Sequence, residues 1–355
     1  MNFAQQLTRH VQKFPLWSLG TSLAAGTAVG ALLQNRKRFD WKNKVVVITG
    51  GSKGLGLILA RDLLLNEAKV VICARDALEL SHAKAWLQDT TKAEVEVISC
   101  DVSQRESVSK MIQGIDSKYG RIDVLINNAG IIQVAPLDFL SMEDFQKSMA
   151  VMYWGTAYPI FAALPKMKKT GGRIVNITSI GGRIGVPHML PYCAAKFAST
   201  GLSLGLRAEL KQHNIVVTTV VPGLMRTGSF GNALFKPGSE DDYKWFSMSA
   251  TLPFVSTDAE SAADQIIRAC EKGQAYKVIG LPAQIGDRFG GLFPGFTADL
   301  MGMVNTALPH GDHTTLSTEN IQGTQLETVR NRASLATNMG KKARERFQLW
   351  KKVSG

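Results

Sequence analysis

The chain has 355 residues, of which 45% are hydrophobic and 20% charged, which is enough apolar material for a buried core and excludes a chain that is disordered throughout. Lys and Arg outnumber Asp and Glu by 41 to 29, and a formal charge of +12 first suggests nucleic acid or an anionic membrane as partner. The charge lies at the ends, because residues 1–44 carry +6 and residues 329–355 carry +7, leaving −1 for the middle. We therefore expect it to act through two terminal segments.

The first feature along the chain is a run of 19 uncharged residues, 15–33. Its length is enough to cross a bilayer, but its Gly, Ser and Thr content makes insertion marginal. Gly26 and Gly30 form a GxxxG pair that suits close helix packing. Basic residues flank the run and are denser after it, which predicts that everything downstream lies in the cytoplasm. We interpret 1–41 as a spanning or interfacial anchor; a cleaved signal peptide and a core-packing helix are the alternatives.

Short β-branched runs alternate with amphipathic stretches from residue 44 onward, which predicts a parallel sheet covered by helices on both faces. The expected strands are 44–49, 69–74, 94–100, 123–127, 173–178, 215–221 and 276–280. The expected helices are about 55–67, 77–88, 104–118, 142–168, 191–213 and 258–272. The prediction is a single α/β domain over 42–280 with a doubly wound, seven-stranded parallel sheet.

Residues 281–355 are expected to form a helical, basic C-terminal extension without a further strand. Residues 281–309 are apolar and broken by Gly and Pro, and 324–353 has the pattern of a basic helix. The part from 335 to 353 fits an interfacial helix on anionic lipid, with a solvated surface helix as the alternative. Nucleic-acid binding is the weaker use of this charge, and we expect none, because no recognised reading module accompanies it.

A glycine-rich turn follows the first expected strand and precedes a helix. It comprises Thr49, Gly50, Gly51, Ser52, Lys53, Gly54, Leu55 and Gly56. Glycines at such a turn let the backbone approach a pyrophosphate, and the helix N-terminus attracts the phosphates. The context favours a dinucleotide site over a merely structural turn.

The end of the second expected strand indicates which dinucleotide binds. An acidic residue there would hold the ribose hydroxyls of NAD, but Ala74 takes that place and Arg75 follows. Arg75 and Lys53 are suited to the 2′-phosphate of NADP. The alternative is that both are solvated rim residues, with Asp76 neutralising Arg75.

Tyr192 and Lys196 lie four residues apart at the start of an expected helix, so that both side chains project from one face. A lysine ammonium near a phenol favours the phenolate and is expected to lower its pKa from about 10. The phenol would then be a usable proton donor and acceptor. Ser179, at the end of a buried strand, would bond the same carbonyl oxygen.

Five separated motifs together resemble the short-chain dehydrogenase/reductases. They are the glycine turn, Asn127-Asn128-Ala129-Gly130, Ser179, the Tyr192 and Lys196 pair, and Pro222-Gly223, and the resemblance covers about 42–280. It implies a Rossmann sheet and an NAD(P)-dependent, metal-free oxidoreductase site, with Ser179, Tyr192 and Lys196 as catalytic residues. It also implies that Thr49 and Asn127 support the cofactor loops and the sheet. The adenine would contact Asp101 and Val102, the nicotinamide ribose Lys196, and the carboxamide Thr227. The remaining implied cofactor residues are those of the glycine turn, Arg75, Asn128, Ala129, Gly130, Tyr192, Pro222 and Gly223.

One position departs from this family. Its members usually carry an Asn that holds a water in a proton relay, where this chain has Met152. A thioether cannot replace the amide. Either Ser148 or a water held by backbone carbonyls takes over the role of the Asn, or turnover is slow. The alternative function is a nucleotide-binding protein with little turnover.

The segment after Pro222-Gly223 is apolar and is expected to form a substrate lid. Seven side chains would line a pocket for a lipophilic ketone or alcohol, unless about half of them simply pack on the fold: Met225, Phe230, Leu234, Phe235, Trp245, Phe246 and Met248. Arg226 or His188 would meet a polar end. We predict an NADP-dependent carbonyl reductase acting on a ketoacyl, steroid-like or retinoid-like compound at the cytoplasmic side of a membrane, assembled as a homodimer or homotetramer. A membrane-bound adaptor or scaffold is the second class. The four cysteines have no pairing or metal-binding spacing and are expected to be buried thiols.

Overall fold

The computed structural model describes residues 39–236, 240–252, 255–309, 319–329 and 346. Residues 1–38 of the expected anchor 1–41, including the uncharged run 15–33, lie outside these residues, as does almost all of the expected basic helix beyond Val329. Trp41, at the end of the expected anchor, is buried in the domain. No helix among the described residues is long and apolar enough to cross a membrane. From Asp40 onward the chain forms one compact unit.

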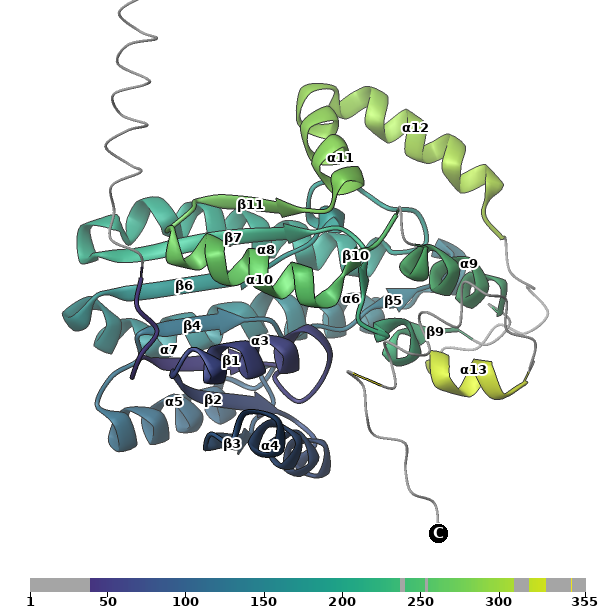
Figure 1. Ribbon diagram of the computed structural model, residues 1–355. Coiled ribbons are helices and arrows are strands. Elements are labelled where there is room, and N and C mark those ends of the chain that lie inside the picture. Colours follow the sequence, from purple (N-terminus) through teal and green to yellow (C-terminus); the bar gives the residue numbers. More distant parts are fainter. Residues whose placement is uncertain (1–38, 237–239, 253–254, 310–318, 330–345, 347–355) are drawn as a thin grey trace, which may run out of the picture. The chain divides into compact units, whose positions relative to one another are not determined.

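A seven-stranded sheet organises this unit (Figure 1). Its strands are β1 (Val45–Thr49), β2 (Lys69–Ala74), β3 (Val95–Ser99), β4 (Val124–Asn127), β6 (Gly172–Ile177), β7 (Ile215–Pro222) and β11 (Tyr276–Ile279). They pair in the order β11-β7-β6-β4-β1-β2-β3, and every pairing is parallel. The predicted doubly wound sheet is therefore confirmed, with each strand within about two residues of its expected bounds.

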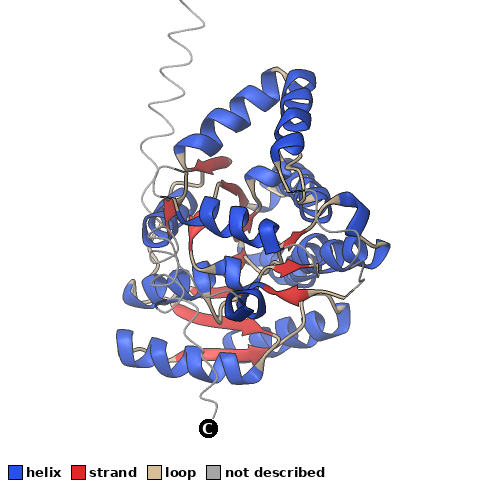
Figure 2. Ribbon diagram, turned by 90° about the vertical axis from the view of Figure 1, so that its right-hand side faces the viewer, coloured by secondary structure: helices blue, strands red, loops and turns tan. Residues whose placement is uncertain are grey.

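Helices cover both faces of the sheet (Figure 2). One face carries α3 (Gly54–Leu65), α4 (Ala77–Thr91) and α10 (Ala259–Glu271), and the other carries α5 (Arg105–Tyr119), α7 (Gly155–Thr170) and α8 (Leu190–Glu209). The inner strands β1, β2 and β4 are buried along nearly their whole length because both faces are covered, whereas the edge strands β3 and β11 are only partly buried. All four cysteines are buried free thiols, as expected.

The expected helix 142–168 is interrupted. It divides into α6 (Met142–Ser148), a π-helical turn over Met149–Trp154, and α7. The hydroxyls of Thr156 and Ser199 both donate to the carbonyl of Met152, at 2.8 and 2.9 Å, and side-chain insertion of this kind distorts a helix. Hydrophobic spacing alone does not reveal such a turn.

The expectation of no strand after residue 280 is wrong. Residues 281–309 form the helices α11 (Leu281–Leu292) and α12 (Pro294–Ala307), but β12 (Ile321–Gln322) and α13 (Gly323–Val329) follow them. β12 joins β9 (Leu234–Phe235) and β5 (Gln133–Val134) in a separate three-stranded sheet. A further small sheet pairs β8 (Met225–Arg226) with β10 (Thr257–Asp258), and α9 (Glu240–Thr251) lies between them in the chain. Strands of two residues show no periodicity, so the sequence does not predict them.

Candidate active site

The glycine turn joins β1 to α3 with a geometry that requires glycine. Gly50 has φ +64°, and a Cβ there would lie 2.8 Å from Cα of Ala129. At Gly56 a Cβ would lie 2.2 Å from the carbonyl oxygen of Gly50. The turn thus packs against the loop after β4, and the N-terminus of α3 begins at Gly54 beside it. A helix N-terminus with open backbone N–H groups is suited to bind phosphate.

Thr49 and Asn128 hold the two cofactor loops together. The Thr49 hydroxyl accepts hydrogen bonds from the backbone N–H groups of Asn128 and Ala129, at 3.0 and 3.1 Å. The Asn128 amide donates back to the carbonyls of Thr49 and Gly50, at 3.1 and 2.9 Å. Asn127, expected with Thr49 to support the cofactor loops and the sheet, donates to Asn176 on the neighbouring strand β6 at 2.9 Å and so links two strands of the sheet. The bridge between the loops is therefore made by Asn128.

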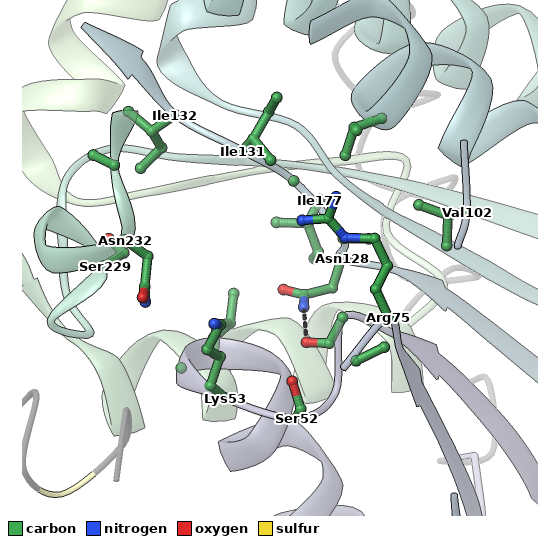
Figure 3. A pocket seen from close by; sticks show the side chains of 18 of the residues that line it. Ser52, Lys53, Arg75, Val102, Asn128, Ile131, Ile132, Ile177, Ser229 and Asn232 are labelled. Carbon is green, nitrogen blue, oxygen red and sulfur yellow. Dashed lines mark hydrogen bonds between the residues drawn. The ribbon is translucent and has the colours of Figure 1, made fainter. Parts of the chain in front are cut away.

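A cavity of about 710 Å³ opens along these loops, within the usual size of ligand sites (Figure 3). It lies by the carboxyl ends of β1 and β4, where the strand order reverses and where open α/β sheets bind their ligands. The predicted residues that line it are Gly50, Ser52, Lys53, Gly54, Leu55, Arg75, Asp101, Val102, Asn128, Ala129, Gly130, Tyr192, Lys196 and Thr227. Thr49, Gly56, Ser179, Pro222 and Gly223 do not line it.

The end of the cavity beside β2 carries both basic and acidic groups. Lys53 forms an ion pair with Glu79 at 2.7 Å, and the Ser52 hydroxyl donates to the other carboxylate oxygen at 3.2 Å. Arg75 is exposed, and among the described residues its guanidinium makes no hydrogen bond or ion pair. Asp76 caps α4 by accepting from the backbone of Leu78 and Glu79, and among the described residues it forms no ion pair with Arg75. Glu79 escaped the sequence analysis because nothing local marks it as a neighbour of the glycine turn.

Tyr192 and Lys196 project from the first turns of α8 into the cavity, as their spacing predicted. Lys196 Nζ lies 5.9 Å from the centroid of the Tyr192 ring and donates to the carbonyl of Ile177 at 2.9 Å. Ser179 follows β6, makes a side-chain hydrogen bond with Tyr192, and accepts from the backbone of Gly181 at 3.0 Å. The three residues expected to be catalytic are therefore brought together.

Burial dominates the protonation of this group. Removal from water raises the pKa of Tyr192 to about 12, although the hydrogen bond from Ser179 acts in the opposite direction. Burial also lowers the pKa of Lys196 to about 8. In the protein alone the phenol pKa is therefore raised, and the expected lowering by the ammonium is not seen, because both groups lose solvation.

Met152 lies where the family's relay Asn was expected. Its side chain is 1% exposed, and a Cβ added at Gly130 would lie 3.8 Å from both Lys196 Nζ and Met152 Cγ. The Met152 carbonyl is already bonded by two hydroxyls. Ser148, the side chain suggested as a substitute, is buried without a hydrogen-bond partner among the described residues and does not line the cavity.

The expected lid residues divide between the cavity and the protein core. Met225 and Leu234 line the cavity, whereas Phe230, Phe235 and Phe246 are at most 3% exposed and pack together beneath it. Trp245 donates to Asp242 at 3.1 Å, and Met248 is 46% exposed.

Arg226 and His188, which were expected to contact a polar end of the substrate, both bond to other protein groups. Arg226 donates to the carbonyl of Ser256, and His188 bonds buried Asp242 at 2.6 Å. The cavity wall instead contains Ser229, Asn232 and Gln322, which the sequence analysis did not identify. No sequence pattern marks Gln322 as a site residue, because it reaches the cavity only through the pairing of β12 with β9.

Comparisons with known proteins identify the family of this chain. Residues 44–235 match the family described as short chain dehydrogenase. A putative oxidoreductase, SadH, of Mycobacterium tuberculosis is 33% identical over 251 residues, covering 70% of this chain and 90% of that protein. An 11-beta-hydroxysteroid dehydrogenase A of Sesamum indicum is 32% identical over 243 residues, which cover 67% of this chain and 68% of that protein. The chain belongs to the short-chain dehydrogenase family and is an oxidoreductase of that family.

Among solved structures, a short-chain dehydrogenase from Streptomyces avermitilis superposes with a TM-score of 0.63 at 28% identity. It covers 75% of this chain and 97% of that chain. Residues 1–43 and 236–355 lie outside the family match, so the features of these segments have to be argued from the chain itself.

Proposed function

We propose that this protein is an NADP(H)-dependent reductase that converts a carbonyl of a lipophilic substrate to an alcohol, and oxidises the alcohol in reverse. The observation that carries the proposal is the convergence of Ser179, Tyr192 and Lys196 beside a cavity that the glycine turn also lines. A proton donor and a dinucleotide-binding turn on one cavity are what carbonyl reduction requires.

The chain's own residues would divide the work as follows. NADPH, when bound, supplies the hydride. Tyr192 donates its phenolic proton to the carbonyl oxygen, and Ser179 holds that oxygen by a second hydrogen bond. Lys196, fixed by the carbonyl of Ile177 at 2.9 Å, stabilises the developing phenolate through its positive charge. In the reverse direction the tyrosine accepts the alcohol proton.

Two observations support NADP over NAD. The carboxyl end of β2 offers Ala74 where an acid would hold ribose hydroxyls, and Arg75 beside it has an uncommitted guanidinium at the cavity rim. Lys53 supports the same preference only if it leaves Glu79, since the two are paired at 2.7 Å. The pair is partly exposed, so exchange of the carboxylate for a phosphate dianion is inexpensive.

A lipophilic substrate is supported by the apolar wall of the cavity. Ile131, Ile132, Val151, Met225 and Leu234 line it, and the charged residues Lys147 and Lys196 also border the cavity. The related protein from Sesamum is named for a steroid substrate, which favours a compound of that class. Turnover measured with ketoacyl, steroid-like and retinoid-like compounds would show which of these classes the protein reduces.

A membrane surface is supported by the hairpin of α11 and α12, visible at the top of Figure 1. α11 turns small residues toward the domain: an added Cβ at Gly286 or Gly290 would lie 3.1 or 3.2 Å from the Ile184 side chain. Its large residues Leu281, Ile285 and Leu292 are 60 to 73% exposed. A helix with its apolar face outward needs an external apolar partner, and the basic ends of the chain favour an anionic bilayer.

A homodimer is supported by a second apolar surface on α7 and α8. Trp154, Phe161, Phe197 and Leu204 are 41 to 56% exposed there. Gly201 and Gly205, where an added Cβ would meet nothing, leave room for close helix approach. A second copy of the chain is the proposed partner for this surface.

A nucleotide-binding protein with weak turnover is the second candidate, favoured by Met152. Its thioether occupies the place beside Lys196 where an amide would help to pass protons. The deciding experiment measures NADPH and NADH oxidation over a panel of lipophilic ketones, together with NADPH binding. Turnover faster with NADPH supports the reductase, and tight NADPH binding without turnover on any ketone supports the second candidate. Preference for NADH would contradict the cofactor assignment.

A further inference from the structure

Residues 320–326 lie directly on the segment 229–235. β12 pairs antiparallel with β9, with Ile321 opposite Phe235 and Gln322 opposite Leu234. On its other side β9 pairs with β5, which follows the cofactor loop after β4. The C-terminal extension thus supplies the third strand of a sheet that begins at the dinucleotide site, and it does so from outside the residues that match the family.

A buried polar cluster joins the same segments. Lys236 is fully buried and pairs with one oxygen of Asp144 at 2.8 Å. The other Asp144 oxygen accepts from the Asn320 amide at 2.9 Å, and the Asn320 oxygen accepts from Gln133 at 3.0 Å. Buried charges are tolerated only when their hydrogen-bonding capacity is met, so Asn320 completes the environment of this pair.

Residue 323 lies so close to the segment 229–235 that only glycine fits there. A Cβ at Gly323 would lie 2.4 Å from the carbonyl oxygen of Phe230 and 3.0 Å from the Tyr243 ring. The Gly323 N–H donates to the carbonyl of Ala233 at 3.0 Å, and Leu326 packs into the cluster of Phe235 and Phe246. Backbone approaches this close leave no room for a side chain.

The segment held in this way forms one wall of the cavity. Ser229, Asn232, Ala233 and Leu234 line it together with Gln322, and Figure 3 shows Ser229 and Asn232 on the side opposite Arg75 and Val102. Without residues 320–326, β9 would be paired on one side only, and an edge strand of two residues opens easily.

We propose that residues 320–326 form a strap that keeps the 229–235 segment closed on the dinucleotide site, with Asn320 and Gly323 as its positioning residues. The identity of the dinucleotide as NADP(H) rests on the proposed function, whereas the closure itself does not.

Two variants test it in the full-length protein: Asn320→Ala, which removes one side chain from the cluster, and Gly323→Ala, which introduces the clash. Gly302→Ala is the matched control, because an added Cβ at that position of α12 meets nothing. Two quantities are measured: the dissociation constant for NADPH, and amide hydrogen exchange of 229–236 with β1 as internal reference. Loss of one buried hydrogen bond corresponds to about a tenfold change in an equilibrium constant.

We expect both variants to weaken NADPH binding about tenfold and to speed amide exchange in 229–236, while β1 stays as protected as in wild type. The kcat at saturating NADPH should be nearly unchanged. The Gly302→Ala control should behave as wild type. Unaltered exchange in 229–236 for both variants would refute the strap, and faster exchange with unaltered NADPH binding would refute its role in closing the site. If the wild-type protein does not bind NADPH, the cofactor assignment fails, while the exchange measurement still decides whether the strap holds the segment.

Discussion

Glu79 holds the lysine of the glycine turn: its carboxylate lies 2.7 Å from Lys53 Nζ, and the residues come from α4 and from the turn before α3. The carboxylate lines the cavity at the end where Arg75 lies. A negative charge at this place opposes a 2′-phosphate and at the same time occupies a lysine that would bind it. If the cofactor is NADP, as proposed, we therefore expect the strength of its binding to depend on Glu79 as well as on Lys53 and Arg75.

We predict that Glu79→Gln lowers the KM for NADPH several-fold and leaves that for NADH nearly unchanged. The exposed pair contributes about 1 kcal/mol at most, and removing the charge also frees Lys53 for the phosphate. Steady-state kinetics with both cofactors measures the change. Asp89→Asn is the control, since Asp89 pairs with Lys92 on the same helix at 3.0 Å, away from the cavity. A higher KM for NADPH would show that Glu79 assists the cofactor.

Tyr192→Phe should reduce carbonyl reduction by about 10² to 10⁴-fold, because the proton donor is lost while the ring remains. NADPH binding, followed by cofactor fluorescence, should be retained, since the ring still fills its place beside Lys196. Full turnover in this variant would disprove the assignment of Tyr192.

Reduction should slow as the pH rises through about 8. Lys196 has a pKa lowered to about 8 by burial, so its ammonium is present below that pH and lost above it, whereas Tyr192, at about 12, stays protonated throughout. The pH profile of kcat/KM measures this. Lys196→Arg keeps its charge and should remove the decline, at lower activity. A decline that persists in the arginine variant would have another origin.

Met152→Asn should raise turnover by about tenfold or more if proton transfer limits the wild-type enzyme, because an amide can hold the relay water that a thioether cannot. Met149→Asn, in the same π-helical turn, is the control. A folded Met152→Asn protein that binds NADPH with unchanged turnover would show that the relay is not limiting.

Polar replacement of the outward face of the hairpin should weaken membrane binding. The triple variant Leu292→Ser, Phe293→Ser and Phe296→Ser removes side chains that are 54 to 73% exposed, and should reduce partition onto anionic vesicles about tenfold or more. Flotation compares it with wild type and with chains lacking 1–40 or 329–355. Leu65→Ser and Leu137→Ser, which replace equally exposed residues elsewhere, are the controls. Unchanged partition for the triple variant would exclude the hairpin as a membrane contact.

The sequence by itself determined the seven-stranded sheet, the glycine turn, and the pairing of Tyr192 with Lys196. Each depends on local patterns: β-branched runs between amphipathic helices, glycines where a backbone approaches another, and a spacing of four on one helix face. Such local patterns predict the same structure regardless of the contacts that the rest of the chain makes.

The tertiary structure alone decided the partner of Lys53, the place of Met152 beside Lys196, the raised pKa of Tyr192, and the contact of Gln322 with the cavity. These depend on distance and burial between elements remote in the chain. Three of the expected lid residues, Phe230, Phe235 and Phe246, became core for the same reason, since apolar character does not tell whether a side chain faces a cavity or the protein interior. The strap belongs here too, because only folding brings Asn320 to Asp144, 176 residues away.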